Sequence, residues 1–168
     1  MSQALAEQRA AVISDLNYRL HFDISADAEA AITGRAVIDL RLRRNTQPLQ
    51  LDFQGGPAAV RSLTSNGEKP RYSVEDEHIV LPPTSLSPGP NRIEIEFTAG
   101  PEALNRNPDY LYTLFAPDRA RTAFPLFDQP DLKATWELSL SVPDGWVALS
   151  NAPVASATSG HGRREYRF

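Results

Sequence analysis

The side chains that could support hydrolytic or metal chemistry in this chain are few and widely spaced. The three histidines, His21, His78 and His161, have no second ligand at the fixed spacing that zinc sites use. No cysteine occurs, which excludes disulfides, thiolate metal sites and cysteine nucleophiles. We therefore predict that each histidine is solvated and that this chain holds no metal or other cofactor by itself.

Two groups of carboxylates could be considered for acid–base catalysis, which needs two acids held in different environments. Residues 75–77 are three consecutive acids in a turn, a pattern typical of a solvated tip. Asp128 and Asp131 flank a proline, so we expect them to order that turn through bonds to the backbone. Pairing with Arg119 or Arg121 is the other possibility, and we expect an ion pair between Arg121 and Asp128. With no Gly-x-Ser-x-Gly elbow and no glycine-rich phosphate loop, we predict no catalytic residue.

Length and charge set the broad class. The 168 residues are 41% hydrophobic and 23% charged, which is typical of one soluble globular domain. The 17 basic and 21 acidic residues give a net charge of -4 without a basic block, so nucleic acid is not an expected partner. Residues 1–13 lack a signal-peptide pattern, and no apolar run approaches the roughly 20 residues that cross a bilayer. We expect no membrane partner and a cytoplasmic location.

Alternation of apolar and polar residues with a period of two dominates the chain and predicts about nine short strands. The expected strands lie in the segments 18–24, 36–42, 49–53, 60–63, 72–74, 78–81, 93–97, 136–142, 146–149 and 165–168. One helix is expected at residues 3–11, and a loop or loose hairpin tip at residues 152–162. The pattern favours an all-β fold, an antiparallel sandwich or barrel with at most one short helix.

Residues 101–129 depart from this pattern, with little alternation, four prolines and five aromatic residues. A loop of this length in a compact domain is either functional or packed against something. We expect Phe124 and Phe127 to be core residues beneath the loop. For Tyr110 and Tyr112 a core position and an interface position both stay open, because tyrosine suits surfaces that a partner half buries.

Residues 121–135, here called the signature segment, read Arg-Thr-Ala-Phe-Pro-Leu-Phe-Asp-Gln-Pro-Asp-Leu-Lys-Ala-Thr. They closely resemble the block Arg-Arg-Ala-Phe-Pro-Cys-Phe-Asp-Glu-Pro-x-x-Lys-Ala-Thr. That block belongs to the amino-terminal domain of the aminopeptidase N family of zinc metallopeptidases, which are related to leukotriene hydrolases. Residues 148–153, Ala-Leu-Ser-Asn-Ala-Pro, resemble a second family block, and the likeness spans roughly residues 12–168. The residues that carry the structural motif are Arg121, Phe124, Pro125, Phe127, Asp128 and Pro130.

The resemblance implies a saddle-like antiparallel β-sandwich over residues 13–168, preceded by an extension at residues 1–12. In the family this domain packs against a catalytic domain that carries Gly-x-Met-Glu-Asn and the zinc motif His-Glu-x-x-His. Neither motif occurs here. The chain therefore resembles a non-catalytic amino-terminal domain that walls the active-site cleft of a zinc aminopeptidase. Zinc and the peptide substrate would belong to the parent enzyme, and the main partner would be the catalytic domain of the same polypeptide.

The resemblance also points to residues 107–116 as the segment that faces the cleft, with Asn107, Tyr110, Tyr112 and Ala116 as its candidate residues. Many family members carry a Glu or Gln seven residues before the Ala of Ala-Phe-Pro, where it binds the free amine of the substrate. Here that position is Ala116, which has no acceptor, so this contribution is absent or comes from elsewhere. Leu126 in place of the usual Cys is a packing change.

Two other functions stay open from the sequence. The chain could be a free-standing β-sandwich binding module that uses the aromatic loop 107–127, or a small hydrolase in its own right. If it is the amino-terminal domain, we expect it to expose an apolar face that the catalytic domain would cover.

Overall fold

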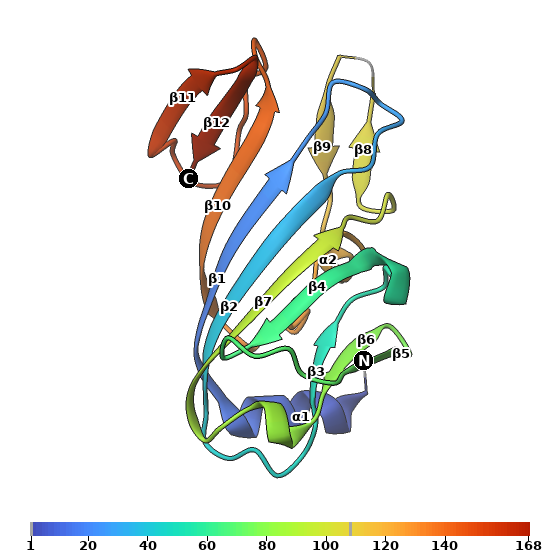
Figure 1. The fold of residues 1–168 in the computed structure, drawn as a ribbon, viewed down its shortest axis with the longest axis vertical. Helices are drawn as coiled ribbons and strands as arrows, with labels where there is room; N and C mark the ends of the chain where they lie inside the picture. Colours follow the sequence, from blue (N-terminus) through green and yellow to red (C-terminus); the bar gives the residue numbers. More distant parts are fainter. Residues whose placement is uncertain (1, 108) are drawn as a thin grey trace.

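The computed structural model describes residues 2–107 and 109–168, and most of the regular structure in them is β-strand (Figure 1). The elements in chain order are α1 (Gln3–Val12), β1 (Ile13–Asp23), β2 (Thr33–Leu42), β3 (Leu49–Asp52), β4 (Val60–Ser65), β5 (Ser73–Glu75), β6 (His78–Leu81), β7 (Gly89–Thr98), β8 (Leu104–Arg106), β9 (Leu111–Thr113), α2 (Ala120–Ala123), β10 (Ala134–Pro143), β11 (Ser156–Gly160) and β12 (Arg163–Arg167). Short 3-10 turns precede β4 (Pro57–Ala59) and β7 (Pro83–Ser85).

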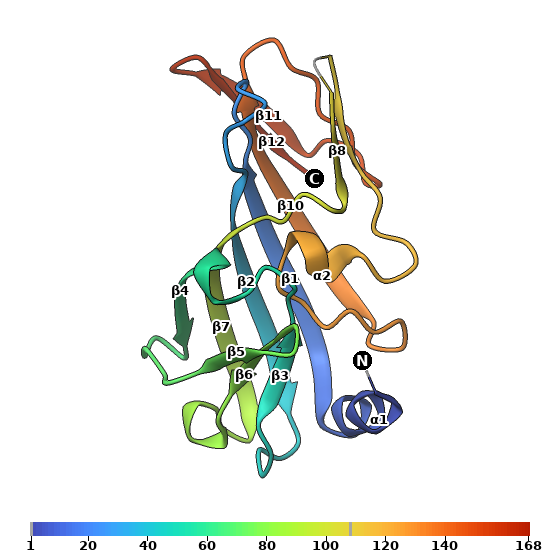
Figure 2. The same ribbon diagram turned by 90° about the vertical axis from the view of Figure 1, so that its right-hand side faces the viewer.

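One long sheet forms the main layer, with the strand order β11-β12-β10-β1-β2-β7-β4. The three-stranded sheet β3-β6-β5 and the hairpin β8-β9 are separate from it. Figure 2 shows α1 and the small sheet at one end of the long sheet, and β8 with β11 and β12 at the other. The predicted all-β sandwich is confirmed. One neighbouring pair, β1 with β10, is parallel, a direction that the alternation of residues could not indicate.

The helices differ in small ways from the expectation. Ser2 caps α1, because its Oγ accepts the N–H of Leu5 at 3.2 Å, and the helix ends at Val12, one residue later than predicted. A second helical segment, the four-residue α2, lies in the long loop where none was expected. Neither helix of the described residues has the length and apolar character needed to span a membrane.

Three segments of the chain pair differently from the predicted strands. Residues 146–149 form no strand, and Val147 and Leu149 point largely into solvent, because no sheet neighbour pairs with this crossing between β10 and β11. Residues 156–167 form the hairpin β11-β12, so the predicted loose tip contains a full strand. The hairpin β8-β9 supplies regular structure inside the long loop.

The two faces of the long sheet have opposite character. On β1, Tyr18, Leu20 and Phe22 are buried on the inner face, and the residues between them face outward. The inner side chains join those of β2, β3, β6, β7 and the signature segment in one hydrophobic core. On the outer face, Arg19 and Arg92 both pair with Asp39. This outer face is therefore a charged surface, and the core lies on the inner side alone.

Part of the inner face stays uncovered beside β10. The register aligns Tyr18 with Trp136, and their rings stack with centroids 4.1 Å apart, so the apolar residues of β10 face inward. Nevertheless Trp136 is 48% exposed, and Leu138 and Leu140 are only half-buried. The predicted exposure of apolar surface is therefore present along this strand.

Tyr18 provides a test of how the inner face holds the signature segment. Its buried hydroxyl accepts the N–H of Phe127 at 2.9 Å, and burial raises the pKa of Tyr18 far above its ordinary value, so the hydroxyl stays neutral. Tyr18→Phe leaves that N–H without its acceptor and should lower the free energy of unfolding by about 1–3 kcal/mol, measured by denaturant unfolding. The matched change Tyr72→Phe, at an exposed ring, should stay within about 0.5 kcal/mol. Equal effects of the two variants would contradict the role of this hydrogen bond.

Candidate functional site

The signature segment runs along the inner face of the long sheet, from α2 to the start of β10. Phe124, Pro125 and Phe127 are buried, which confirms the prediction that the two phenylalanines lie in the core. The ring of Phe124 meets Phe22 and Trp136 edge to face, with centroids 6.0 and 6.1 Å apart. The segment is therefore held by aromatic packing, while Pro130 lies exposed at its turn.

Backbone hydrogen bonds tie the same segment to two strands. Leu126 and Asp52 exchange N–H···O bonds of 2.7 and 3.2 Å. The segment therefore pairs with the last residue of β3 through an antiparallel bridge. The N–H of Gly100, after β7, donates to the carbonyl oxygen of Thr122 at 3.0 Å. A Cβ at position 100 would lie 2.3 Å from that oxygen, so only glycine permits this approach. These bonds fix the first half of the segment, at Thr122 and Leu126.

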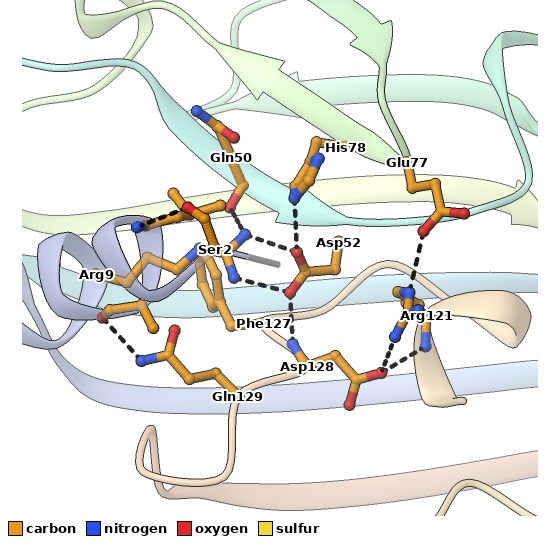
Figure 3. A network of polar contacts seen from close by, with 12 residues as sticks. Ser2, Arg9, Gln50, Asp52, Glu77, His78, Arg121, Phe127, Asp128 and Gln129 are labelled. Carbon is orange, nitrogen blue, oxygen red and sulfur yellow. Dashed lines mark hydrogen bonds and ion pairs between the residues drawn. The ribbon is translucent and has the colours of Figure 1, made fainter. Parts of the chain in front are cut away.

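The predicted ion pair between Arg121 and Asp128 is present, with Nη1 3.9 Å from Oδ2, but it is the weaker of their contacts (Figure 3). The backbone N–H of Arg121 donates to the same carboxylate oxygen at 3.1 Å. The guanidinium has closer partners in Asp118, at 2.9 Å, and Glu77, at 3.3 Å. Arg121 therefore joins α2 to the turn between β5 and β6.

Asp128 sits in an environment that disfavours its charge. Burial raises the pKa of this carboxyl above its ordinary value, and the nearby Asp52 carboxylate raises it further. The N–H of Arg121 acts in the opposite direction by donating to the ionised form. The N–H of Asp128 itself donates to Asp52 Oδ2 at 2.8 Å. The Asp128 side chain therefore bonds to the backbone of Arg121, seven residues earlier, and the expected bonds within its own turn are not what holds it.

The four candidate residues of the segment 107–116 are all exposed. The N–H of Asn107 donates to the carbonyl oxygen of Tyr110 at 2.8 Å, at the tip of the hairpin β8-β9. Tyr110 and Tyr112 are 56% and 51% exposed, and their rings stack at 6.2 Å. Ala116 follows β9 and precedes α2. Pro108, within this segment, lies outside the described residues, and the cleft-facing role of the segment stays a prediction.

Arg106 is an anchor of this hairpin that the sequence did not reveal. Its guanidinium reaches from β8 to the turn between β1 and β2, where it donates to the carbonyl oxygens of Ser25, Asp27 and Ala30 at 2.6, 2.6 and 2.9 Å. Because all three acceptors are backbone atoms of one turn, no residue type near them could have signalled the contact.

The histidines do not converge on a metal site. His161 is exposed, and His21 lies on the outer face with Nδ1 3.0 Å from Ser139 Oγ. His78 was expected to be solvated, and this is wrong: its side chain is only 16% exposed, and Nε2 lies 3.1 Å from Asp52 Oδ1. The reason is that the β3–β6 register places it opposite Asp52. Within residues 2–107 and 109–168, no group of three metal-ligating side chains comes together, so the donors present do not fit a zinc ion.

Arg9 and Asp52 are the other residues that the sequence did not single out. They form an ion pair buried from solvent between α1 and the end of β3. Alternation over residues 49–53 places Asp52 on the wet side of its strand, and the short helix gives no sign that Arg9 points inward. A single sequence carries no clear signal for such a pair.

Comparison with known proteins bears on the origin of the signature segment. The model of the Peptidase M1 N-terminal domain matches residues 14–168. The chain belongs to this family. The resemblance noted at the signature segment is thereby confirmed and extends over residues 14–168.

Relatives and solved structures of the M1 N-terminal domain agree with this assignment. Aminopeptidase N of Streptomyces lividans is 31% identical over 160 residues, covering 88% of this chain and 18% of that protein. Aminopeptidase N of Acetobacter pasteurianus is 28% identical, covering 93% of this chain and 48% of that protein. An M1 zinc metallopeptidase from Deinococcus radiodurans, bound to a Tyr-Ser-Ala substrate, shares the fold with a TM-score of 0.75 at 22% identity, covering 94% of this chain and 39% of that one. The chain spans less than half the length of each.

Asp128 allows the turn of the signature segment to be tested. Asp128→Ala removes the acceptor of the Arg121 N–H and should lower the free energy of unfolding by about 1 kcal/mol in denaturant unfolding at neutral pH. Asp128→Asn keeps an acceptor oxygen and removes the charge, so it should stay close to the wild type. A loss that is the same for both variants would show that the charge matters more than the hydrogen bond.

The raised pKa adds a pH dependence to the same comparison. Between the ordinary aspartate pKa of 3.8 and the raised value, the folded state holds a proton that the unfolded state has lost. The stability of the wild type relative to Asp128→Asn should therefore be highest below the ordinary pKa, fall as the pH rises through the raised pKa, and level off above it. Denaturant midpoints between about pH 3 and about pH 7 measure this, and a relative stability that rises with pH would contradict it.

Proposed function

We propose that this chain is the non-catalytic amino-terminal domain of a zinc-dependent aminopeptidase that removes N-terminal amino acids from peptides. The observation that carries the proposal is the family match over residues 14–168 in a chain that spans 18% of an aminopeptidase N. In this proposal residues 13–168 form the domain, and the parent enzyme is cytoplasmic. Zinc and the chemistry of peptide hydrolysis are assigned to residues outside this chain, since the donors in the described part of the chain do not fit the ion.

The inner face beside β10 is the surface proposed to pack on the catalytic domain. Trp136 is the largest apolar side chain left half-exposed there, and Leu114, Val147 and Leu149 add exposed apolar area elsewhere on the domain. Apolar surface of this kind typically marks an interaction site. The outer face of the same sheet carries paired charges instead, which suits contact with water.

The segment 107–116 is proposed to wall the substrate cleft of the parent enzyme. Its support is the exposure of Asn107, Tyr110, Tyr112 and Ala116 on and after a hairpin that Arg106 holds in place. Ala116 offers only a methyl group at the position where relatives of the resembled family bind the substrate amine. Recognition of that amine would therefore come from another part of the parent enzyme.

A second candidate function is a free-standing binding module that uses the aromatic loop 107–127. The observation that favours it is the exposed stack of Tyr110 and Tyr112, since two tyrosine rings present a large contact area at little cost in side-chain entropy. A binding screen of the 168-residue chain would then find a ligand, and Tyr110→Ala and Tyr112→Ala would weaken its binding.

The first test of the proposed function is the coding sequence beyond Phe168. It should encode His-Glu-x-x-His within the next few hundred residues, roughly one to three further domains. The complete polypeptide loaded with zinc should release amino acids from a chromogenic aminoacyl substrate, and the 168-residue chain should not. A missing motif, or zinc-stimulated hydrolysis by the 168-residue chain alone, would sink the proposal.

The second test concerns the apolar surface beside β10. The 168-residue chain should bind a dye that reports exposed apolar surface, and Trp136→Ser should reduce that binding because it removes the exposed aromatic ring beside β10. Tyr72→Ser, at an exposed aromatic residue in a different part of the fold, is the matched control and should reduce it much less. A wild-type chain that binds no dye and stays monomeric at high concentration would count against the proposed docking surface.

A further inference from the structure

Helix α1 carries one of the most deeply buried charges of the protein, although it precedes residues 14–168, which match the M1 N-terminal domain. Arg9, on α1, is 1% exposed and reaches Asp52 at the end of β3, which is 2% exposed. Nη1 lies 2.8 Å from Oδ2 and Nη2 lies 2.8 Å from Oδ1 (Figure 3). This two-pronged geometry is the strongest arrangement of an arginine and a carboxylate.

The carboxylate of Asp52 is also a junction for two other segments. His78, on β6, places Nε2 3.1 Å from Oδ1, and the N–H of Asp128, in the signature segment, donates to Oδ2 at 2.8 Å. One side chain of β3 thus contacts α1, β6 and the signature segment. The two carboxylate oxygens of Asp52 make all of these contacts, so losing one partner changes the charge and hydrogen bonding available to the others.

Helix α1 contacts the residues on both sides of Asp128. The guanidinium of Arg9 lies over the ring of Phe127, 5.4 Å from its centroid. The amide of Gln129 donates from Nε2 to the carbonyl oxygen of Ala6 at 2.9 Å. Arg9 also donates to the carbonyl oxygen of Gln50 at 2.8 Å. The helix therefore contacts the signature segment directly at Phe127 and Gln129, and it reaches the residue between them through Asp52.

The charge balance makes Arg9 the decisive partner. A buried carboxylate that loses its cation is strongly unfavourable, because nothing replaces the water it gave up. Arginine stays charged at any pH at which proteins fold, whereas His78 is a cation only when both ring nitrogens carry hydrogen. Without α1, the Asp52 carboxylate keeps the hydrogen bond from the Asp128 N–H and the contact with His78.

We propose that α1 is a strap and that Arg9 is a positioning residue, which acts through Asp52 to hold the signature segment against the long sheet. Residues 3–12 are then an integral part of the domain and not the extension that the resemblance implied. The proposal concerns the fold of this chain and stands whether or not the parent protein is an aminopeptidase.

Hydrogen exchange of the 168-residue chain, read peptide by peptide, tests the strap. In Arg9→Met, amides of the signature segment should exchange at least about tenfold faster than in the wild type, which corresponds to about 1.4 kcal/mol of local opening. Peptides from β2 and β7 should stay protected. Arg41→Met is the matched control, because Arg41 is exposed and its ion pair with Asp15, 3.5 Å long, lies at the surface. It should leave the exchange rate of every peptide unchanged.

A double variant separates charge compensation from simple packing of the helix. Arg9→Met/Asp52→Asn removes both charges and keeps an acceptor oxygen at position 52, so it should restore slow exchange in the signature segment. If Arg9→Met fails to fold, the double variant still tests the proposal, because it should fold and exchange slowly in the signature segment. The strap is overturned if Arg9→Met leaves the signature segment as protected as the wild type, or speeds exchange in β2 and β7 equally. It is likewise overturned if the double variant exchanges as fast as Arg9→Met, since the loss would then come from packing alone.

Discussion

A carboxylate enclosed in an apolar sandwich needs donors on every side, and meeting that need at Asp52 organises much of this molecule. Its oxygens receive hydrogen bonds from α1 and from the signature segment, and they lie beside a histidine of β6. Because the signature segment is held there, β10 begins at a fixed place beside β1. The stack of Trp136 on Tyr18 follows from that starting point. Burial of one charge thus holds the segment that leads into β10, and pairing with β1 then fixes the strand itself.

The long sheet has one charged face and one apolar face, and the apolar face is covered unevenly. The small sheet, α1 and the signature segment cover most of it, while β10 keeps Trp136 half-exposed. An isolated sandwich would gain by closing this gap with its own residues. A domain that works inside a larger protein has no such need, and the fraction of its relatives that this chain spans agrees with that picture.

The parts of the fold that the sequence predicted are those governed by local pattern. Alternation at Tyr18, Leu20 and Phe22 identified β1 and its buried face, and the aromatic character of Phe124 and Phe127 predicted their burial inside a long loop. The ion pair of Asp52 with Arg9 could not be predicted, because period two assigns Asp52 to the wet face and only the folded chain covers that side. The parallel pairing of β1 with β10 was equally hidden, since alternation is the same for either strand direction.

The parallel pair has a consequence for how the chain is made. Asn17 and Thr135, partners across β1 and β10, are 118 positions apart. One edge of β1 can be filled by β2 soon after synthesis, but the other edge stays open until β10 has emerged. An open, largely apolar strand edge invites pairing with other chains. During synthesis the first strand therefore keeps one edge open over the whole stretch that separates Asn17 from Thr135.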